Sequence, residues 1–327
     1  MGPRYARGCV PVAVRADPHA RSAWLHEVMA HHDTQLVRTA DGRDLEVLVT
    51  GPADGLPLVF HHGTPQAAVP FGILERPATE RGLRTITYSR PGYGRSTPRT
   101  DAATRATVGD DAVDTATVLD ALGHDTFVTL GWSGGGPRAL ACAALLPGRC
   151  LAATSGVGIA PPDADGLDLT AGMGPENVAE YAATAAGPEA LTAFLEEHGT
   201  PVLRATAEEI VSELSGLLPP VDRAVMTGEL GDYLAAASRH AGAQGIVGWR
   251  DDDLTHTRPW GFDLGAIEVP TAVWQGTEDL MVPFAHAQWL AANVAGARAH
   301  LVEGEGHVSL LMRMGDILDD LLSMVRP

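Results

Sequence analysis

The most informative part of the sequence is TFVTLGWSGGGPRALACAAL, residues 126–145. It begins with an apolar, β-rich run, passes through a serine at position 133 that glycines flank, and ends in a small-residue pattern typical of a helix. A Gly-x-Ser-x-Gly motif between a strand and a helix is typical of a nucleophilic serine on a tight turn. The glycines leave room for a strained backbone at Ser133, and the following helix presents free N–H groups. We therefore predict that Ser133 is a nucleophile.

A carboxylate and a histidine follow Ser133 at positions suited to activate it. Asp279 lies in a loop after the apolar stretch 271–276, and His307 follows the short strand-like stretch 299–302. A serine hydroxyl is a poor nucleophile until a base takes its proton. His307 is the expected base, and Asp279 would hold its tautomer and stabilise the imidazolium. The order serine, acid, histidine is one of three known orders for such triads.

Two other positions for the acid remain open. Glu278 is adjacent to Asp279, although the pattern Gly-x-x-Asp-x-x-Val-Pro over residues 276–283 favours Asp279. Asp163 or Asp165 could also supply the carboxylate, because both follow the predicted strand 151–156.

Four motifs together identify the chain as similar to the α/β-hydrolase superfamily, in the branch with a helical cap. They are HHGTP at 61–65, SRPGYGRS at 89–96, the serine turn, and GTED at 276–279 with Gly306-His307. The tetrahedral oxyanion formed during acyl transfer needs two aimed donors, and the N–H of Gly134 should be one. The resemblance places the second donor at the residue after His-Gly, which is Thr64.

The rest of the chain alternates between strand and helix patterns. We expect an amphipathic helix at 108–122, ended by Gly123, and another at 70–81. Expected strands are 34–40 and 44–50 as a hairpin around Asp41-Gly42, then 57–61, 84–88, 126–130 and 151–156. The fold class is therefore α/β, with a mostly parallel central β-sheet covered by helices on both faces. This is also the fold that the resemblance implies.

Strand signals vanish between about residues 161 and 260. Helices are predicted instead at 175–186, 188–198, 206–217 and 222–240, and Thr206 with Glu209 forms a capping box. The resemblance implies an all-helical cap over Ser133, and a small helical domain for oligomerisation is the alternative. The predicted organisation is a core of 34–160 and 261–327, a cap of 161–260, and an N-terminal extension of 1–33 that is either a flexible tail or partly helical.

Composition limits the partners. The chain has 23 basic and 41 acidic residues, a formal net charge of −18, which disfavours nucleic acid and anionic membranes. No apolar run is long enough to span a bilayer, and the first 29 residues lack the apolar core of a secretory signal. Three cysteines are too few for a disulfide framework. We predict a cytoplasmic protein with reduced thiols.

Other polar motifs are given structural roles. His61 and His62 are adjacent on a strand and so point to opposite faces, which makes them poor co-ligands. Asp251–Asp253 is expected to be a solvated loop, because it lacks the EF-hand spacing. Arg90 either orients substrate or holds its loop by a salt bridge, and the second is favoured. No cofactor and no metal are predicted.

The predicted function is a serine hydrolase that forms an acyl-enzyme from a small carboxylic ester, thioester or lactone. The proline iminopeptidases share the capped fold, but their His-Gly-Gly-Pro-Gly and Gly-Gly-Ser-Trp-Gly signatures are replaced here by residues 62–65 and 131–135. An aminopeptidase and a non-catalytic ligand-binding protein remain alternatives. The expected partner is a small-molecule substrate, and the sequence predicts no oligomeric state.

Overall fold

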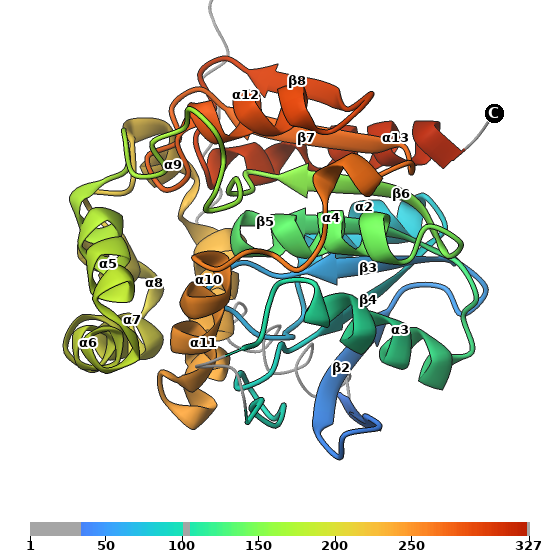
Figure 1. Cartoon of the computed structure of the whole chain (residues 1–327), viewed down its shortest axis with the longest axis horizontal. Coiled ribbons are helices and arrows are strands. Elements are labelled where there is room, and N and C mark those ends of the chain that lie inside the picture. Colours follow the sequence, from blue (N-terminus) through green and yellow to red (C-terminus); the bar gives the residue numbers. More distant parts are fainter. Residues whose placement is uncertain (1–33, 101–104, 326–327) are drawn as a thin grey trace, which may run out of the picture. The chain divides into compact units, whose positions relative to one another are not determined.

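The computed structural model describes residues 34–100 and 105–325, so the predicted extension at 1–33 lies outside the described residues. This part of the chain is built around an eight-stranded sheet in the order β1-β2-β4-β3-β5-β6-β7-β8 (Figure 1). The strands are β1 (Gln35–Arg38), β2 (Asp44–Thr50), β3 (Leu56–His61), β4 (Leu83–Tyr88), β5 (Phe127–Trp132), β6 (Cys150–Gly156), β7 (Thr271–Gly276) and β8 (Arg298–Val302). β2 pairs antiparallel with β1 and with β4, and every other neighbouring pair is parallel. The predicted hairpin and the mostly parallel sheet are confirmed.

Helices cover both faces of the sheet. Leu58 and Phe60 of β3 belong to a core shared with α2 (Gly72–Glu80) and α13 (Met314–Val325). Val59, between them, belongs to a second core with α3 (Asp110–Leu122), α4 (Gly136–Leu145) and α12 (Phe284–Asn293). Successive side chains on a strand point to opposite faces, so a strand covered on both sides must be apolar almost throughout.

The predicted helix at 108–122 is present as α3, and it ends where the sequence indicates. Gly123 follows its last residue in a left-handed conformation, with φ +74°, and its N–H bonds back to carbonyls of the last turn. A glycine adopts this conformation without the steric cost that a Cβ would add, which is why it terminates helices so often.

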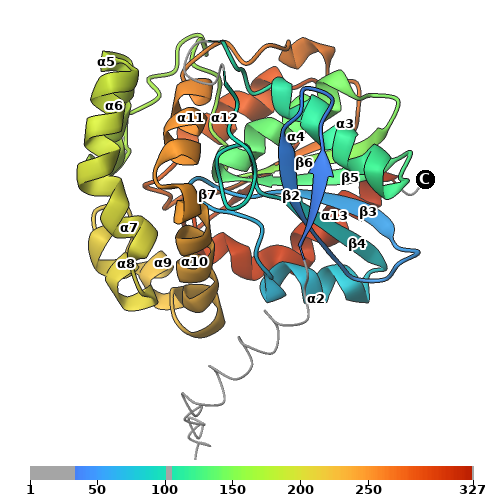
Figure 2. The same cartoon turned by 90° about the horizontal axis from the view of Figure 1, so that it is seen from below.

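Helices fill the segment between β6 and β7, which we call the helical insertion. They are α5 (Pro175–Ala186), α6 (Pro188–Phe194), α7 (Thr200–Arg204), α8 (Ala207–Glu213), α9 (Pro220–Val225), α10 (Gly228–Ala241) and α11 (Val247–His256). In Figures 1 and 2, α10 and α11 lie between the sheet and α5–α8. Tyr233 of α10 stacks on Phe71 at 3.9 Å between ring centroids, and Glu229 pairs with Arg76 of α2. These contacts join the insertion to the core.

Local signals in the insertion are partly confirmed. α5 has the predicted bounds, and Thr206 and Glu209 form the predicted capping box before α8. The helix predicted at 188–198 instead continues from α6 into a π-helical turn, Leu195–Gly199. α8 ends at Glu213, four residues before the predicted end at Leu217.

The single helix predicted over 222–240 is wrong. The chain forms α9 and α10 with a break at Met226 and Thr227, where Thr227 is extended with φ −135° and ψ 161°. Gly228 then begins α10 with φ +60°, a conformation that suits glycine. Because of the break, Asp222 lies on α9 rather than on α10. It is fully buried, and its carboxyl group contacts the backbone of residues 307–309.

The solvated loop predicted at Asp251–Asp253 is also wrong. All three residues lie in α11, and Asp251 and Asp252 are buried. The physical reason is the presence of two buried arginines, Arg90 and Arg138, which pair with Asp252. A charged run usually marks a solvated surface, but paired charges can be buried when hydrogen bonds satisfy them.

Candidate active site

Ser133 lies on a sharp turn at the end of β5, at the start of a 3₁₀ turn that leads into α4. Its φ is +55°, which is uncommon for a residue other than glycine. A Cβ on Gly131 would lie 2.5 Å from the carbonyl carbon of Gly135, and one on Gly135 would lie 2.7 Å from that of His61. The turn therefore requires glycine at both positions, and backbone strain of this kind clusters at functional sites.

Asp279 and His307 meet at the same edge of the sheet, in the loops after β7 and β8. Nδ1 of His307 lies 2.8 Å from Oδ2 of Asp279, and the two side chains are 6% and 0% exposed. Oδ2 also accepts a hydrogen bond from Gln275, and Oδ1 accepts the N–H groups of Met281 and Val282, each at 2.8 Å. The carboxylate is thus held rigidly and faces the ring.

The electrostatic environment favours protonation of His307. Burial alone would lower the pKa of the ring, but the carboxylates of Asp279 and Asp222 outweigh it and raise the pKa above its ordinary value. With a raised pKa, His307 can accept a proton and hold it while the neighbouring carboxylate of Asp279 stabilises the imidazolium.

The alternative acids do not reach the histidine. Glu278, Asp163 and Asp165 are all exposed, and none of them hydrogen-bonds to His307 among the described residues. Asp279 is the carboxylate that the structure brings to the ring.

Ser133 and His307 line one cavity of about 700 Å³. Within the described chain, the Ser133 hydroxyl makes no hydrogen bond to the His307 ring. Hydrogen bonds of this kind are often long in ligand-free enzymes and tighten when substrate binds. The structure therefore brings the nucleophile and base candidates to one cavity, with Asp279 behind the base.

Thr64 and Gly134 line the same cavity, next to each other. Thr64 follows β3, and a Cβ on Gly134 would lie 3.2 Å from the Cβ of Thr64. Neither backbone N–H has a hydrogen-bond partner in the part of the chain that the structure describes. Both donors are therefore available to an oxyanion formed at Ser133.

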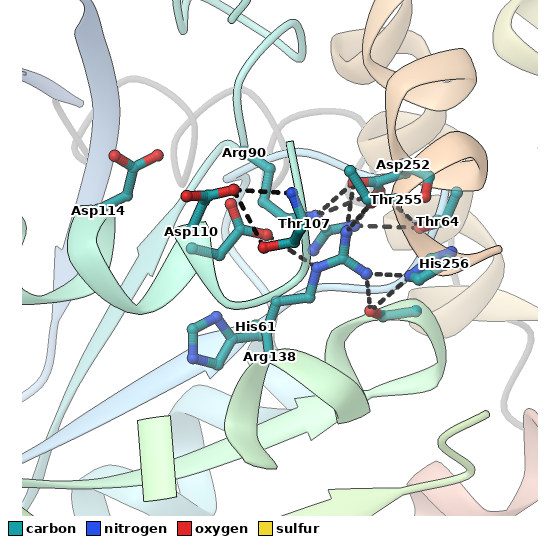
Figure 3. A network of polar contacts seen from close by, with 12 residues as sticks. His61, Thr64, Arg90, Thr107, Asp110, Asp114, Arg138, Asp252, Thr255 and His256 are labelled. Carbon is teal, nitrogen blue, oxygen red and sulfur yellow. Dashed lines mark hydrogen bonds and ion pairs between the residues drawn. The ribbon is translucent and has the colours of Figure 1, made fainter. Parts of the chain in front are cut away.

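Thr64 and Gly134 contact a buried ionic network that sequence reasoning missed. Figure 3 shows its members Arg90, Arg138 and Asp252. Asp252 of α11 accepts hydrogen bonds from Arg90 at 2.6 Å and from Arg138 of α4 at 2.9 Å. Its Oδ2 also accepts the hydroxyl of Thr64 at 2.7 Å, and Arg138 donates to the carbonyl of Gly134 at 2.6 Å. One aspartate of the insertion is thus linked to both oxyanion-hole candidates.

The charges in this network are matched. Burial opposes ionisation of Asp252, but the guanidinium groups of Arg90 and Arg138 hold its pKa well below its usual range. Both arginines are 1% exposed. Arg138 also pairs with Asp111 at 2.9 Å. The sequence signals for the network were the acidic run at 251–253 and the salt bridge expected for Arg90, and the sequence did not show that these two are partners.

The predicted structural role of Arg90 is supported by its contacts. Its guanidinium donates to the carbonyl oxygens of His62 and Gly63 and to the hydroxyl of Thr64. Arg90 is not among the residues that line the cavity. It therefore holds the loop after β3 and pairs with Asp252, whereas the prediction was a salt bridge that holds its own loop at 91–96.

His61 and His62 have different partners. His62 accepts the N–H of Arg90 through Nε2, so its Nδ1 is the donor to the carbonyl of Gly63 at 2.8 Å. His61 instead lies near Cys142 and edge-on to Tyr88. Burial lowers the pKa of both rings, that of His61 to about 3, so both are neutral.

The cavity wall is apolar and acidic. Its charged lining residues are Glu176, Glu180, Glu197, Glu213 and Asp253, and no lysine or arginine lines it among the described residues. Trp249 donates to Glu180, and burial raises the pKa values of Glu180 and Asp253. No arginine or lysine in the described part of this wall would face a bound anion, and His307 is a lining group whose protonation is favoured.

No helix in the described ranges combines the length and apolar character that crossing a bilayer requires.

Comparison with known proteins identifies the family. The family model of the alpha/beta hydrolase fold matches residues 57–313. The chain is 31% identical over 305 residues to a non-heme chloroperoxidase of Streptomyces lividans, covering 89% of this chain and 99% of that protein. Solved structures with the same fold include a hydrolase from Pseudomonas aeruginosa PA01 (TM-score 0.65, 20% identity, 90% and 99% of the two chains covered). A thermophilic esterase from Thermogutta terrifontis is similar to the same degree (TM-score 0.63, 20% identity, 91% and 100% covered). This chain is an enzyme of the α/β-hydrolase fold family.

Proposed function

We propose that the protein is a serine hydrolase that cleaves a small carboxylic ester, thioester or lactone through an acyl-enzyme. Ser133 is the nucleophile, His307 the base and Asp279 the acid behind it. The observation that carries the proposal is the 2.8 Å contact of Asp279 with His307, which lines one cavity together with the left-handed Ser133.

The proposed steps follow from this geometry. Nδ1 of His307 bonds to Asp279, which leaves Nε2 to take the proton from the Ser133 hydroxyl as it attacks the substrate carbonyl. The N–H groups of Thr64 and Gly134 receive the resulting oxyanion. Collapse of this intermediate expels the alcohol, which takes the proton from Nε2. A water molecule activated by His307 then releases the acid by the same steps in reverse.

We propose that the helical insertion acts as a cap on this site. The cavity is lined from the core by Ser133 and His307, and from the insertion by residues that include Phe194, Leu214 and Trp249. Closing an active site in this way excludes water and strengthens the electrostatic interactions within it. The insertion therefore shapes the space that the acyl and alcohol groups occupy.

The acidic wall limits the substrate. Its carboxyl groups and its lack of a lining arginine or lysine favour an ester that is uncharged or positively charged. We expect p-nitrophenyl acetate and butyrate to be hydrolysed much faster than a p-nitrophenyl hemisuccinate of similar length, which carries a carboxylate.

The test combines labelling with turnover. A fluorophosphonate probe should label the protein, and Ser133→Ala should abolish labelling and ester hydrolysis while the fold, measured by circular dichroism, is kept. Cys142→Ser is the matched control, because it changes a buried thiol of α4 that does not line the cavity, and this variant should still be labelled. A folded protein that resists the probe would support a ligand-binding role and contradict the proposal.

The same assays separate the alternative activity. An aminopeptidase would release amine from aminoacyl arylamides, and Ser133→Ala would abolish that release. We expect esters to be preferred, and a preference for prolyl arylamide would favour the iminopeptidase alternative.

The peroxidase name of the Streptomyces lividans relative suggests a second candidate, for which we propose that hydrogen peroxide replaces water as the acyl acceptor. A peroxide oxygen would attack the acyl carbonyl, and Ser133 would leave and recover its proton, giving a peroxy acid. Formation of peroxy acid from acetate and peroxide, lost in Ser133→Ala, is the assay for this candidate.

A further inference from the structure

A buried carboxylate of the insertion contacts the backbone of the proposed base. Asp222 lies on α9 and is 0% exposed. Its Oδ2 accepts the N–H of His307 at 2.9 Å, and its Oδ1 accepts the N–H groups of Val308 at 3.0 Å and Ser309 at 2.7 Å. Burial raises the pKa of this carboxyl group, whereas the N–H groups that it accepts and the nearby His307 favour its ionised form.

The loop is shaped around this carboxylate. A Cβ on Gly306 would lie 2.6 Å from Cγ of Asp222, and its three nearest atoms would all belong to that carboxyl group. The carboxyl group of Asp222 thus occupies the space that a side chain at position 306 would need, and position 306 is a glycine. The contact joins positions 85 residues apart in the chain.

Two carboxylates therefore hold His307 in different ways. Asp279 bonds to the ring through Nδ1, whereas Asp222 bonds to the backbone. The ring hydrogen bond leaves the position of the loop undetermined, because the loop can shift while the ring rotates to follow Asp279. Three hydrogen bonds to consecutive N–H groups remove that freedom.

We propose that Asp222 is a positioning residue, which fixes the backbone of His307 from the helical insertion so that the ring can serve Ser133. The inference rests on the proposed function, since it concerns the same base. It also makes the alignment of His307 depend on how the insertion is docked on the core.

The charge of Asp222 supports this role. The charged groups that act on His307 are Asp279, from the loop after β7, and Asp222, from α9. Against the opposing effect of burial, both carboxylates raise the pKa of the ring. Removing the charge of Asp222 should therefore lower the pKa of His307.

Asp222→Asn is the first test variant. Its amide oxygen can still accept Val308 and Ser309, but its NH₂ group would face the N–H of His307, so that bond is lost. We expect kcat and kcat/KM for a p-nitrophenyl ester to fall together by about tenfold to a hundredfold, because small misplacements of a catalytic group have effects of this size. The acidic limb of the kcat/KM profile should move to lower pH.

Asp263→Asn is the matched control. Asp263 is also an aspartate whose carboxylate accepts a backbone N–H before a 3₁₀ turn, but it is exposed and does not line the cavity. Its rates and pH profile should equal those of the wild type. Active sites in every variant are counted by fluorophosphonate titration, so that partial unfolding is not mistaken for a lower kcat.

A second variant tests the contact without changing any charge. Gly306→Ala should displace the Asp222 carboxylate and lower kcat. In an Asp222→Ala background, where the space is free, the same substitution should lower kcat much less. If Gly306→Ala lowers kcat equally in both backgrounds, the contact is not what positions His307.

The outcomes separate this inference from the proposed function. A wild type that reacts with the probe, together with an Asp222→Asn variant of unchanged kcat and pH midpoint, would overturn the positioning role alone. If Asp222→Asn loses stability but keeps its pH midpoint and its kcat per titrated site, the role of Asp222 is merely structural, and the positioning role is overturned as well. A wild type that resists the probe would overturn both.

Discussion

Replacing Asp252 by asparagine would test whether the buried network beneath Thr64 and Gly134 both stabilises the fold and supports the site. The substitution keeps the volume of the side chain and removes its charge. Arg138 would still pair with Asp111, whereas Arg90 would keep only carbonyl and hydroxyl partners. A buried guanidinium would thus lose its carboxylate.

The expected loss of stability is large. Removing one partner of a buried ion pair typically costs about 3–5 kcal/mol, because the remaining charge is left uncompensated. A typical domain is stable by only about 5–15 kcal/mol, so the loss should be evident in any unfolding measurement. The hydroxyl of Thr64 would also lose its acceptor at 2.7 Å, and we expect kcat to fall by about a hundredfold.

The pH dependence gives a second signature. Despite burial, Arg90 and Arg138 hold the pKa of Asp252 below its usual range in the folded state. For a group whose folded pKa is depressed, the stabilisation is complete above the unfolded pKa, about 3.9, and is lost as pH falls toward the folded value. The difference in stability between wild type and Asp252→Asn should therefore be constant near neutrality and narrow below about pH 4.

Urea unfolding followed by tryptophan fluorescence and circular dichroism measures both effects, across a pH series. Asp120→Asn is the control, since Asp120 pairs with Arg149 at an exposed position where ion pairs contribute roughly 0–1 kcal/mol. The reasoning about the network is refuted if Asp252→Asn loses no more unfolding free energy than this control. It is also refuted if the stability difference between wild type and Asp252→Asn does not narrow in acid.

Four further outcomes are expected. Asp279→Asn should lower kcat by about 10⁴, whereas Glu278→Gln should keep near-normal rates; the reverse pattern would reassign the acid. Gly134→Ala should lower kcat by about 10²–10³, because its Cβ would press on Thr64 and disturb an oxyanion donor; an unchanged kcat would remove Gly134 from the oxyanion hole. The acidic limb of kcat/KM should lie above pH 6.5, because the pKa of His307 is raised and the protonated ring cannot act as base; a limb well below that value would count against His307. Added chelator should leave ester hydrolysis unchanged, and a clear loss would contradict the prediction of a metal-free enzyme.

Local patterns were sufficient to predict much of the fold. The glycines around Ser133, the apolar strands and the amphipathic pattern ended by Gly123 each act over a few neighbouring residues. The capping box of Thr206 and Glu209 is of the same kind. Such features depend on backbone sterics and short-range hydrogen bonds, and for that reason they are readable without knowing what the segment packs against.

Two of the errors have a common feature. The helix predicted over 222–240 is broken, and the acidic run 251–253 is helical and largely buried rather than solvated. In both segments an aspartate has partners far away in the chain, with Asp222 bonded to the loop of His307 and Asp252 bonded to Arg90 and Arg138. A carboxylate in a polar segment looks solvated until the partner that compensates its burial is known.

The sequence alone determined the family, the parallel core and the residue types available for acyl transfer, because these follow from short motifs in a set order. Only the tertiary structure decided which carboxylate meets His307 and which aspartates of the insertion reach the site. Those contacts join residues up to 188 positions apart in the chain. They become strong only where folding brings both partners together and removes water from them.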